Sequence, residues 1–195
     1  ERYELLAAPS YNFNLDRRDF IKTFGLGILF IVPTARARAQ QRDQEQESGR
    51  GRFGNNLPQD INAWIHIDET GKVTVLTGKV EFGQNARTSL TQAVADELHV
   101  PVASIQLVMG DTDVVPFDMG TFGSRTTPTM APQLRRAAAA ARDMLIAMAA
   151  EQLQLQPDDL RLVDARFVNH DKSKTLTLAE VAKGRKLIKV IPENI

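Results

Sequence analysis

The sequence contains no cysteine among its 195 residues. A chain without cysteine forms no disulfide, holds no zinc ion or iron–sulfur cluster through its own thiolates, and has no cysteine nucleophile. Its three histidines, His66, His99 and His170, lie far apart and show no metal-ligand spacing. Any chemistry at this chain therefore depends on a bound cofactor or is completed by another chain.

An excess of charge of either sign is also missing, because 24 Lys and Arg balance 24 Asp and Glu. This balance argues against the broad positive surface that binds nucleic acid. Hydrophobic residues make up 43% of the chain and charged residues 25%, which is ordinary for a globular chain with a real core. The length predicts one domain with an appendage.

The N-terminal region lacks an apolar run long enough to cross a bilayer as a helix. Its apolar stretch, Phe24 to Val32, is about nine residues long, against the roughly 20 that a span requires. Arg17 and Arg18 precede the stretch, and a small-x-small end at Ala39 follows it, as in a secretory signal peptide. The order Arg-Arg-x-Phe-Ile-Lys resembles the twin-arginine signal, although Asp16 stands where Ser or Thr is usual.

We therefore expect residues 1–39 to be a twin-arginine signal peptide that is cleaved after Ala39, and the protein to be periplasmic. An amphipathic N-terminal helix with a chance arginine pair is the alternative. Residues 40–58 are rich in Gln, Arg, Glu and Gly and predict a flexible linker, because they cannot bury enough apolar surface to fold alone.

Residues 59–195 carry the periodic patterns of a folded domain. Alternating apolar residues and turn signals predict strands, and apolar residues at helical spacing predict helices. The elements expected are a hairpin over 61–78, a helix over 86–99, a strand over 105–109, a helix over 132–155, a short hairpin over 160–168, a helix that a capping box starts at Thr177, and an extended segment over 187–191. Strands and helices alternate irregularly, which predicts an α+β fold with a mixed sheet packed by two main helices.

Two glycine-bounded segments stand out from this packing pattern. The first is Gly78-Lys79-Val80-Glu81-Phe82-Gly83-Gln84-Asn85, and the second runs from Gly120 to Thr129 with the sequence GTFGSRTTPT. Glycine lets a backbone approach a ligand closely, and hydroxyls with an arginine can bind phosphate or the edge of a heterocycle. These residues indicate either a phosphate- or pterin-like ligand or a structural loop built on Ser/Thr turns.

Several motifs occur in an order that resembles the xanthine dehydrogenase/aldehyde oxidase family. They are the run Gly78–Gln84, the helix through Asp96-Glu97-Leu98, the run from Val108 to Asp113, the run from Gly123 to Met130, the helix through Leu134-Arg135-Arg136-Ala137-Ala138, and the run from Lys183 to Leu187. Within that family, the chain is most similar to the N-terminal part of the molybdopterin-binding large subunit of the isoquinoline 1-oxidoreductase and periplasmic aldehyde dehydrogenase type.

The resemblance implies a molybdenum hydroxylase, which inserts a water-derived oxygen into a C–H bond of an aldehyde or N-heterocycle. It implies molybdopterin, in a dinucleotide form, as a cofactor shared with a partner or a further C-terminal portion. The family's glycine–glutamine turn falls on Gly83 and Gln84, and its pterin-binding stretch falls on Gly123, Ser124, Arg125 and Thr126. The implied partners are the remainder of the large subunit, a small 2Fe-2S subunit and a membrane cytochrome c, with no nucleic acid.

Two departures from the family pattern bear on function. Asn85 stands where the family usually has glycine after the glutamine. The glutamate that acts as the family's general base belongs to a downstream region outside these residues, so the catalytic residues are unknown and the chain alone is expected to be inactive. Asp111, Asp113 and Asp118 are interpreted as loop and cap carboxylates rather than as a substitute base. The alternative function is a non-catalytic exported binding or scaffold protein that has lost the cofactor.

Overall fold

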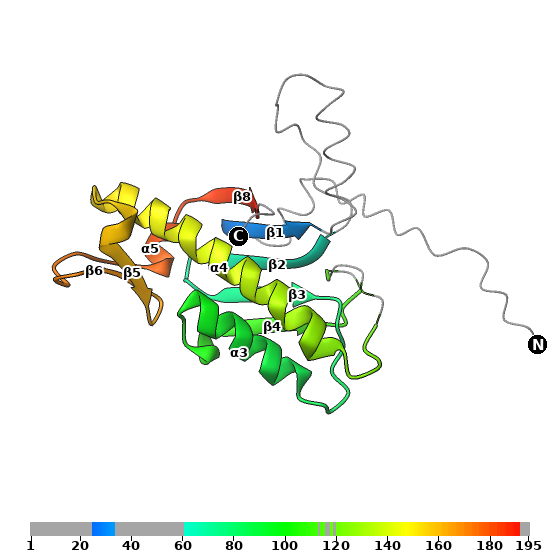
Figure 1. Ribbon diagram of the computed structural model, residues 1–195. Helices are drawn as coiled ribbons and strands as arrows, with labels where there is room; N and C mark the ends of the chain where they lie inside the picture. Colours follow the sequence, from blue (N-terminus) through cyan, green and yellow to red (C-terminus); the bar gives the residue numbers. More distant parts are fainter. Residues whose placement is uncertain (1–24, 34–60, 113, 116–117, 119, 192–195) are drawn as a thin grey trace, which may run out of the picture.

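The computed structural model of this chain describes residues 25–33, 61–112, 114–115, 118 and 120–191 (Figure 1). The strands are β1 (Gly27–Pro33), β2 (Ile61–Asp68), β3 (Val73–Thr77), β4 (Ile105–Met109), β5 (Leu160–Val163), β6 (Arg166–Asn169), β7 (Thr175–Thr177) and β8 (Lys186–Val190). The α-helices are α3 (Ala86–Leu98), α4 (Thr126–Leu153) and α5 (Leu178–Ala182), and the short 3-10 helices are η1 (Val102–Ser104) and η2 (Pro157–Asp159).

Five strands form one mixed sheet in the order β4-β3-β2-β1-β8. The β2–β3 and β1–β2 pairs are antiparallel, whereas β3–β4 and β1–β8 are parallel. Helices α3 and α4 lie side by side across one face of this sheet (Figure 1). This arrangement confirms the α+β fold with a mixed sheet and two main helices.

The main core lies between the sheet and these helices because successive strand side chains point to opposite faces. Ile65, Ile67, Val73 and Val75 are fully buried in one cluster with Leu90 of α3 and the inner face of α4. On the other face, Leu29, Ile31, Leu76 and Val115 form a second, smaller cluster. Each cluster takes alternate residues of the same strands, as the period-2 pattern predicts for sheets buried on both faces.

Helix α4 packs against α3 and the sheet, and small side chains make up much of its buried face. Ala137, Ala138, Ala140 and Ala141 are at most 1% exposed, and alanine allows a close approach of two helices without cost to helix propensity. The helix begins at Thr126, earlier than the expected start near residue 132, and Pro132 lies inside it. The sequence predicts the later start because Pro is favoured in a first turn, but Pro is tolerated here at the cost of one backbone hydrogen bond.

Strand β1 comes from the stretch that the sequence predicts to be the apolar part of a signal peptide. It lies between β2 and β8, and Ile28, Phe30 and Ile31 are fully buried. At Gly27, an added Cβ would lie 2.3 Å from the Ile67 carbonyl oxygen, so only glycine fits this crossing. The folded domain therefore begins before residue 59, where the sequence predicts its start, and cleavage after Ala39 would remove a strand from the sheet interior.

The other expectations for the N-terminal region fall largely outside the described residues. The arginine pair, the cleavage position and the whole 40–58 linker lie there, and they stay predictions. Among the residues that the structure describes, none of the helices is both long enough and apolar enough to cross a membrane.

The C-terminal part forms a second sheet in the order β5-β6-β7, of which β5 and β6 make the expected hairpin. Strand β7 is not predicted, because three residues are too few to show an alternating pattern in the sequence. Helix α5 begins with the expected capping box: the Thr177 hydroxyl accepts a hydrogen bond from the Glu180 N–H, and the Glu180 carboxylate accepts one from the Thr177 N–H. The helix stops at Ala182, and Gly184 follows with a left-handed φ of 67°.

Candidate functional site

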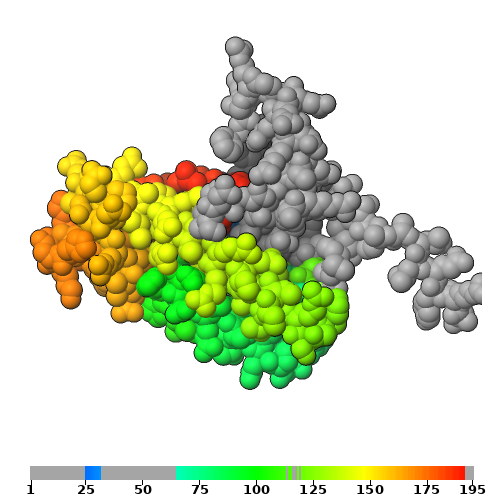
Figure 2. Space-filling view, viewed as in Figure 1, coloured from blue at the N-terminus to red at the C-terminus, as the bar shows by residue number. Residues whose placement is uncertain are grey.

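The two glycine-bounded segments meet at the end of the molecule where α3 and α4 begin (Figures 1 and 2). We name residues 78–85 the first loop and residues 118 and 120–126 the second loop. The Val80 N–H donates a hydrogen bond to the Thr121 hydroxyl over 3.0 Å, and that hydroxyl lies 3.3 Å from the Val80 carbonyl oxygen. One turn further on, the hydroxyls of Ser89 and Thr127 are hydrogen-bonded at 2.9 Å, which links the first turns of the two helices.

A buried ion pair joins the same two loops. The Lys79 ammonium lies 2.7 Å from a carboxylate oxygen of Asp118 and donates a second hydrogen bond to the Gly120 carbonyl over 2.8 Å. The side chains of Lys79 and Asp118 are only 10% and 13% exposed. The interpretation of Asp118 as a loop carboxylate is confirmed, since it also accepts a hydrogen bond from the Gly120 N–H.

In the first loop, Glu81 closes the N-terminus of α3. Its carboxylate accepts hydrogen bonds from the backbone N–H groups of Arg87, Gly83 and Asn85 at 2.8, 2.7 and 3.1 Å. These hydrogen bonds, that of Arg87 above all, lower the pKa of Glu81. Helix N-terminal amides can bind an anion, but at α3 the chain's own carboxylate already accepts hydrogen bonds from the N–H groups of Asn85 and Arg87.

The predicted ligand residue Gln84 is exposed, and its amide group is folded back onto its own loop. Its Nε2 donates to the Val80 carbonyl over 2.9 Å, and its Oε1 accepts from the Phe82 N–H over 2.6 Å. The Thr121 hydroxyl contacts the same Val80 oxygen, so Gln84 lies close to the second loop. An added Cβ at Gly83 would meet nothing within 4 Å, which leaves this backbone open to a ligand.

Asn85 takes the backbone conformation that a glycine would supply. Its φ of 61° and ψ of 23° are left-handed, and asparagine adopts this region more readily than most residues. The departure from the family pattern therefore leaves the turn intact. It no longer favours the alternative that the chain has become a scaffold without a cofactor.

In the second loop, the four predicted ligand residues Gly123, Ser124, Arg125 and Thr126 are consecutive. Gly123 and Ser124 have left-handed φ values of 60° and 54°, and both are exposed, as is Arg125. Thr126 is the first residue of α4 and is 6% exposed. Arg125 stands in the N-cap position of this helix, and its side chain makes no capping hydrogen bond.

These groups suit a ligand that carries both a polar ring and an anionic tail. The exposed Gln84 amide and the open Gly83 backbone can approach a heterocycle. An exposed guanidinium, a hydroxyl and the uncapped amides of α4 favour a phosphate. Within the described part of the chain, no three His, Asp or Glu residues are grouped so that they could hold a metal ion. The exposed Gln84 amide, the Arg125 guanidinium and the first amides of α4 fit an organic, phosphate-bearing cofactor.

Sequence reasoning misses the side chains that shape the site. It gives Glu81 of the first loop no role, and it places Lys79 only as part of a motif. A signal for Glu81 exists, since acidic residues favour helix N-termini. No local signal pairs Lys79 with Asp118, because 39 residues separate them. Asp111 is exposed, and Asp113 lies outside the described residues.

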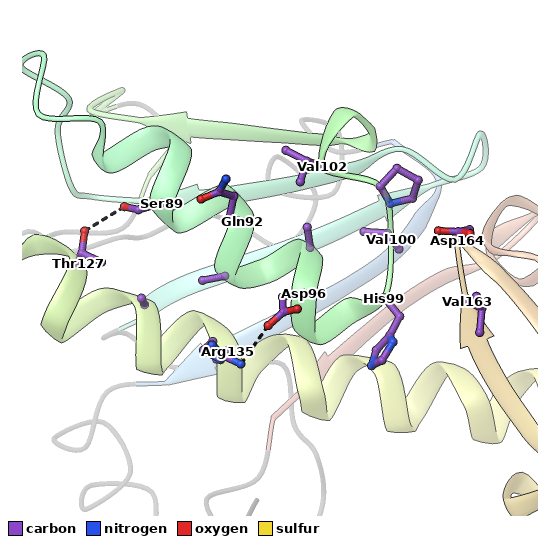
Figure 3. Close-up of a pocket in the computed structure, with 14 residues that line it drawn as sticks. Ser89, Gln92, Asp96, His99, Val100, Val102, Thr127, Arg135, Val163 and Asp164 are labelled. Carbon is purple, nitrogen blue, oxygen red and sulfur yellow. Dashed lines mark hydrogen bonds and ion pairs between the residues drawn. The ribbon is translucent and has the colours of Figure 1, made fainter.

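A separate open groove of about 790 Å³ lies along the outer side of α3 and α4 and is lined in part by Ser89, His99 and Asp164. Figure 3 shows Arg135 of α4 pointing across it to Asp96 of α3. Arg135 lies 3.2 Å from Asp96 and 2.7 Å from Glu97. Arg135 and Asp96 are exposed at 48% and 72%, so this is a surface ion pair, and none of the predicted ligand residues lines the groove.

Comparison with known proteins identifies what this arrangement is similar to. A family model described as the molybdopterin cofactor-binding domain matches residues 5–191. The chain is 34% identical over 121 residues to the gamma subunit of the 6-hydroxypseudooxynicotine dehydrogenase complex of Paenarthrobacter nicotinovorans, covering 62% of this chain and 15% of that subunit. It is 35% identical over 127 residues to one subunit of the nicotinate dehydrogenase of Pseudomonas putida, covering 65% of this chain and 11% of that subunit.

The fold is similar to that of a solved structure of reconstituted CO dehydrogenase from Oligotropha carboxidovorans. The TM-score is 0.56 at 28% sequence identity, and the match covers 76% of this chain and 21% of that one. The chain thus corresponds to a small part of each of these larger proteins.

Proposed function

We propose that this chain, which belongs to the molybdopterin cofactor-binding domain family, supplies one wall of the cofactor site of a molybdenum hydroxylase large subunit. The observation that carries the proposal is the joining of the two loops, Val80 to Thr121 and Lys79 to Asp118, beside the uncapped start of α4. This arrangement presents an amide, hydroxyls and a guanidinium from two loops along one edge.

Each group has a distinct part in holding a molybdopterin. Ser124, Arg125 and the first amides of α4 would bind the phosphate tail, since each hydrogen bond to a charged group contributes roughly 1.5–3 kcal/mol. The Gln84 amide would turn from the Val80 carbonyl toward the pterin. Gly83 and Gly123 would leave room for the ring system. When bound, the cofactor supplies the two-electron redox chemistry, which no side chain of a cysteine-free chain provides.

The finer parts of the proposal concern the whole enzyme. We propose that the complete protein oxidises an aldehyde or N-heterocycle with water-derived oxygen, and that it passes electrons to a small 2Fe-2S subunit and a membrane cytochrome c. We also propose a dinucleotide form of the pterin. An N-heterocyclic substrate is in keeping with the relative named nicotinate dehydrogenase, and partner subunits are in keeping with relatives named as subunits.

The proposal is tested by the molybdenum content of the complete protein, purified with its natural partners. We expect Gly123→Val to abolish most of the bound molybdenum, because the added side chain fills space left for the cofactor. Ser124→Ala is expected to lower it modestly, since one hydroxyl is lost. Metal analysis by mass spectrometry and pterin fluorescence give two independent readouts.

Gly184→Val is the matched control for backbone strain. Gly184 has a φ of 67°, close to the 60° of Gly123. An added Cβ would meet nothing within 4 Å at Gly184, and at Gly123 it would meet the Arg125 side chain at 3.8 Å, an ordinary van der Waals contact. The two variants carry the same strain, so equal losses of molybdenum would contradict the site. A wild-type protein that holds no molybdenum would favour the scaffold alternative.

We further propose that the protein is exported by the twin-arginine pathway and keeps residues 27–33 after export. The pair Arg17 and Arg18 ahead of an apolar stretch supports export. The position of β1 between β2 and β8 argues against cleavage after Ala39. Replacing both arginines by lysine should keep the protein in the cytoplasm, since the signal is read by a receptor. N-terminal sequencing of the exported protein should still find β1, and a start at Gln40 would contradict its retention.

A further inference from the structure

The buried ion pair of Lys79 and Asp118 is not explained by a gain in the free energy of unfolding. Burying two charges carries a desolvation penalty, and replacement of a buried ion pair by apolar residues is often neutral or stabilising. Both side chains are about nine-tenths buried at the edge of the domain. An alternative use of such a pair is geometric, because its partners fix one arrangement of the segments that carry them.

The contacts of Lys79 lead from the sheet to the second loop. Lys79 follows β3 by two residues, and its N–H donates to the hydroxyl of the fully buried Thr77 over 3.4 Å. Its ammonium then holds the Gly120 carbonyl, while Asp118 holds the Gly120 N–H over 2.8 Å. Both backbone polar groups of Gly120 are therefore bound by the pair, three residues before Gly123.

Gly120 needs such support because its conformation is unusual. Its φ of 121° is open only to glycine, which is also the residue with the most conformational freedom to lose on ordering. Without the pair, the contact between Val80 and Thr121 would be the remaining link between these loops that the structure describes. The start of the second loop would then be free to move relative to the first.

We infer that Lys79 and Asp118 are positioning residues that set the spacing of the two loops and so preorganise the cofactor site, an inference that rests on the proposed function. They act through Gly120 and touch no cofactor themselves. A preorganised site loses less entropy when it binds. The pair therefore slows cofactor loss by holding the second loop in its bound arrangement before the cofactor arrives.

The test uses three variants of the complete protein. Lys79→Met removes both side-chain hydrogen bonds of the ammonium. Asp118→Asn keeps an acceptor oxygen for the Gly120 N–H but removes the charge, and it protects the test if Lys79→Met fails to fold. Arg135→Gln is the control, because Arg135 also forms an ion pair between two segments, here α3 and α4. Its side chain is 48% exposed and lies outside both loops.

Two measurements are made on each variant. Hydrogen exchange of the cofactor-free protein reports the order of residues 118–126 against the middle of α4. The rate of molybdenum loss from the loaded protein reports the cofactor site. We expect Lys79→Met to speed exchange in the second loop but not in α4. We also expect it to speed cofactor loss by about tenfold, because the second loop must then be ordered at the cost of the cofactor's binding free energy. Asp118→Asn should fall between Lys79→Met and wild type, and Arg135→Gln should match wild type.

The outcomes separate this inference from the proposed function. Unchanged exchange in the second loop overturns the positioning role, and so does faster exchange with an unchanged rate of molybdenum loss. Equal changes throughout α4 also overturn it, because they indicate a general loss of stability. A wild-type protein that holds no molybdenum overturns the proposed function, and the exchange measurement still reports whether the pair orders the loop.

Discussion

Helices α3 and α4 begin next to each other, but side chains of opposite charge stand at their two N-termini. At α3, the Glu81 carboxylate accepts hydrogen bonds from three backbone N–H groups. At α4, the N-cap residue is Arg125, a cation whose side chain makes no capping hydrogen bond, and within the described residues no carboxylate accepts a hydrogen bond from the first N–H groups of the helix. A helix N-terminus favours a negative charge. At α3 that charge is the Glu81 carboxylate of the chain itself, whereas the N-terminus of α4 can bind the anion of a ligand.

The two glycine-containing loops therefore differ in how their polar side chains are used. The first loop is shaped by its own side chains, with Glu81 and Gln84 both bonded to its backbone. The second loop keeps the side chains of Ser124 and Arg125 exposed. It is held from the first loop by Lys79 and by the Val80–Thr121 contact. Glycine-rich sequence alone does not distinguish a self-closed turn from a ligand cradle. The distinction lies in which charged side chain stands at the helix start.

The largest effect is expected when the α4 N-terminus is given a carboxylate, as α3 has in Glu81. Arg125→Glu reverses the charge at the α4 N-terminus, where the phosphate tail is expected. We expect the molybdenum content of the complete protein to fall by about tenfold or more, because an attractive charge is replaced by a repulsive one. The measurement is metal analysis by mass spectrometry, with Arg125→Gln giving an intermediate loss.

Arg136→Glu is the control for this charge reversal. Arg136 is also an exposed arginine of α4, but it lies well beyond the first turn. The same change in net charge there should leave the molybdenum content near the wild-type value. A similar loss in both variants would mean that the effect comes from general electrostatics rather than from the helix start.

A smaller effect is expected when α3 loses its carboxylate. The pKa of Glu81 is lowered in the folded protein, first of all by the Arg87 N–H. A lowered pKa means that this contribution to the free energy of unfolding is complete above the unfolded-state pKa. It is lost as the pH falls through the folded-state pKa.

Glu81→Gln should therefore lower Tm near neutral pH, and the difference from wild type should shrink in acid. Thermal unfolding followed by circular dichroism across this pH range gives the measurement. Glu151→Gln, at an exposed site in the last turn of α4, is the control and should show no such loss near neutral pH. A Tm difference between Glu81→Gln and wild type that stays constant into acid would mean that the carboxylate charge is not what closes α3.

How far the sequence predicts this fold depends on whether each signal is local. The β2–β3 hairpin, α3 and the capping box at Thr177 follow from periodicity and from contacts within a few residues. Strand β1 does not, because a short apolar run has the same pattern in a signal peptide and in a buried strand. Its place is set by β2 and β8, and β8 lies near the other end of the chain.

The site divides in the same way. The glycine turns and the residues from Gly123 to Thr126 can be found by family resemblance, and the left-handed Asn85 follows from its side-chain chemistry. The pairing of Lys79 with Asp118 cannot be found so, since it depends on how the two loops are brought together by the sheet. Glu81 lies between these cases, because its position in sequence suggests a cap but does not show which amides it reaches.

The smallest expected effect comes from restoring glycine after Gln84. Asn85→Gly relieves a left-handed φ of 61°, which costs a non-glycine residue roughly 1–3 kcal/mol and asparagine the least. It also adds freedom to the unfolded chain, at a cost of about 0.4–1 kcal/mol. The two terms oppose each other, so the free energy of unfolding should change by less than about 1 kcal/mol in urea denaturation.

Asn85→Ala tests the opposite change, to a residue that disfavours the left-handed conformation. Alanine has no polar side chain to support the left-handed region, so it should lower the free energy of unfolding by roughly 1–2 kcal/mol. Molybdenum content should be the same in Asn85→Gly and wild type, because Asn85 keeps the family's turn and its side chain is exposed. A large rise in molybdenum on restoring glycine would instead mean that the Asn85 side chain obstructs the cofactor, and the self-closed first loop would then be a barrier rather than a support.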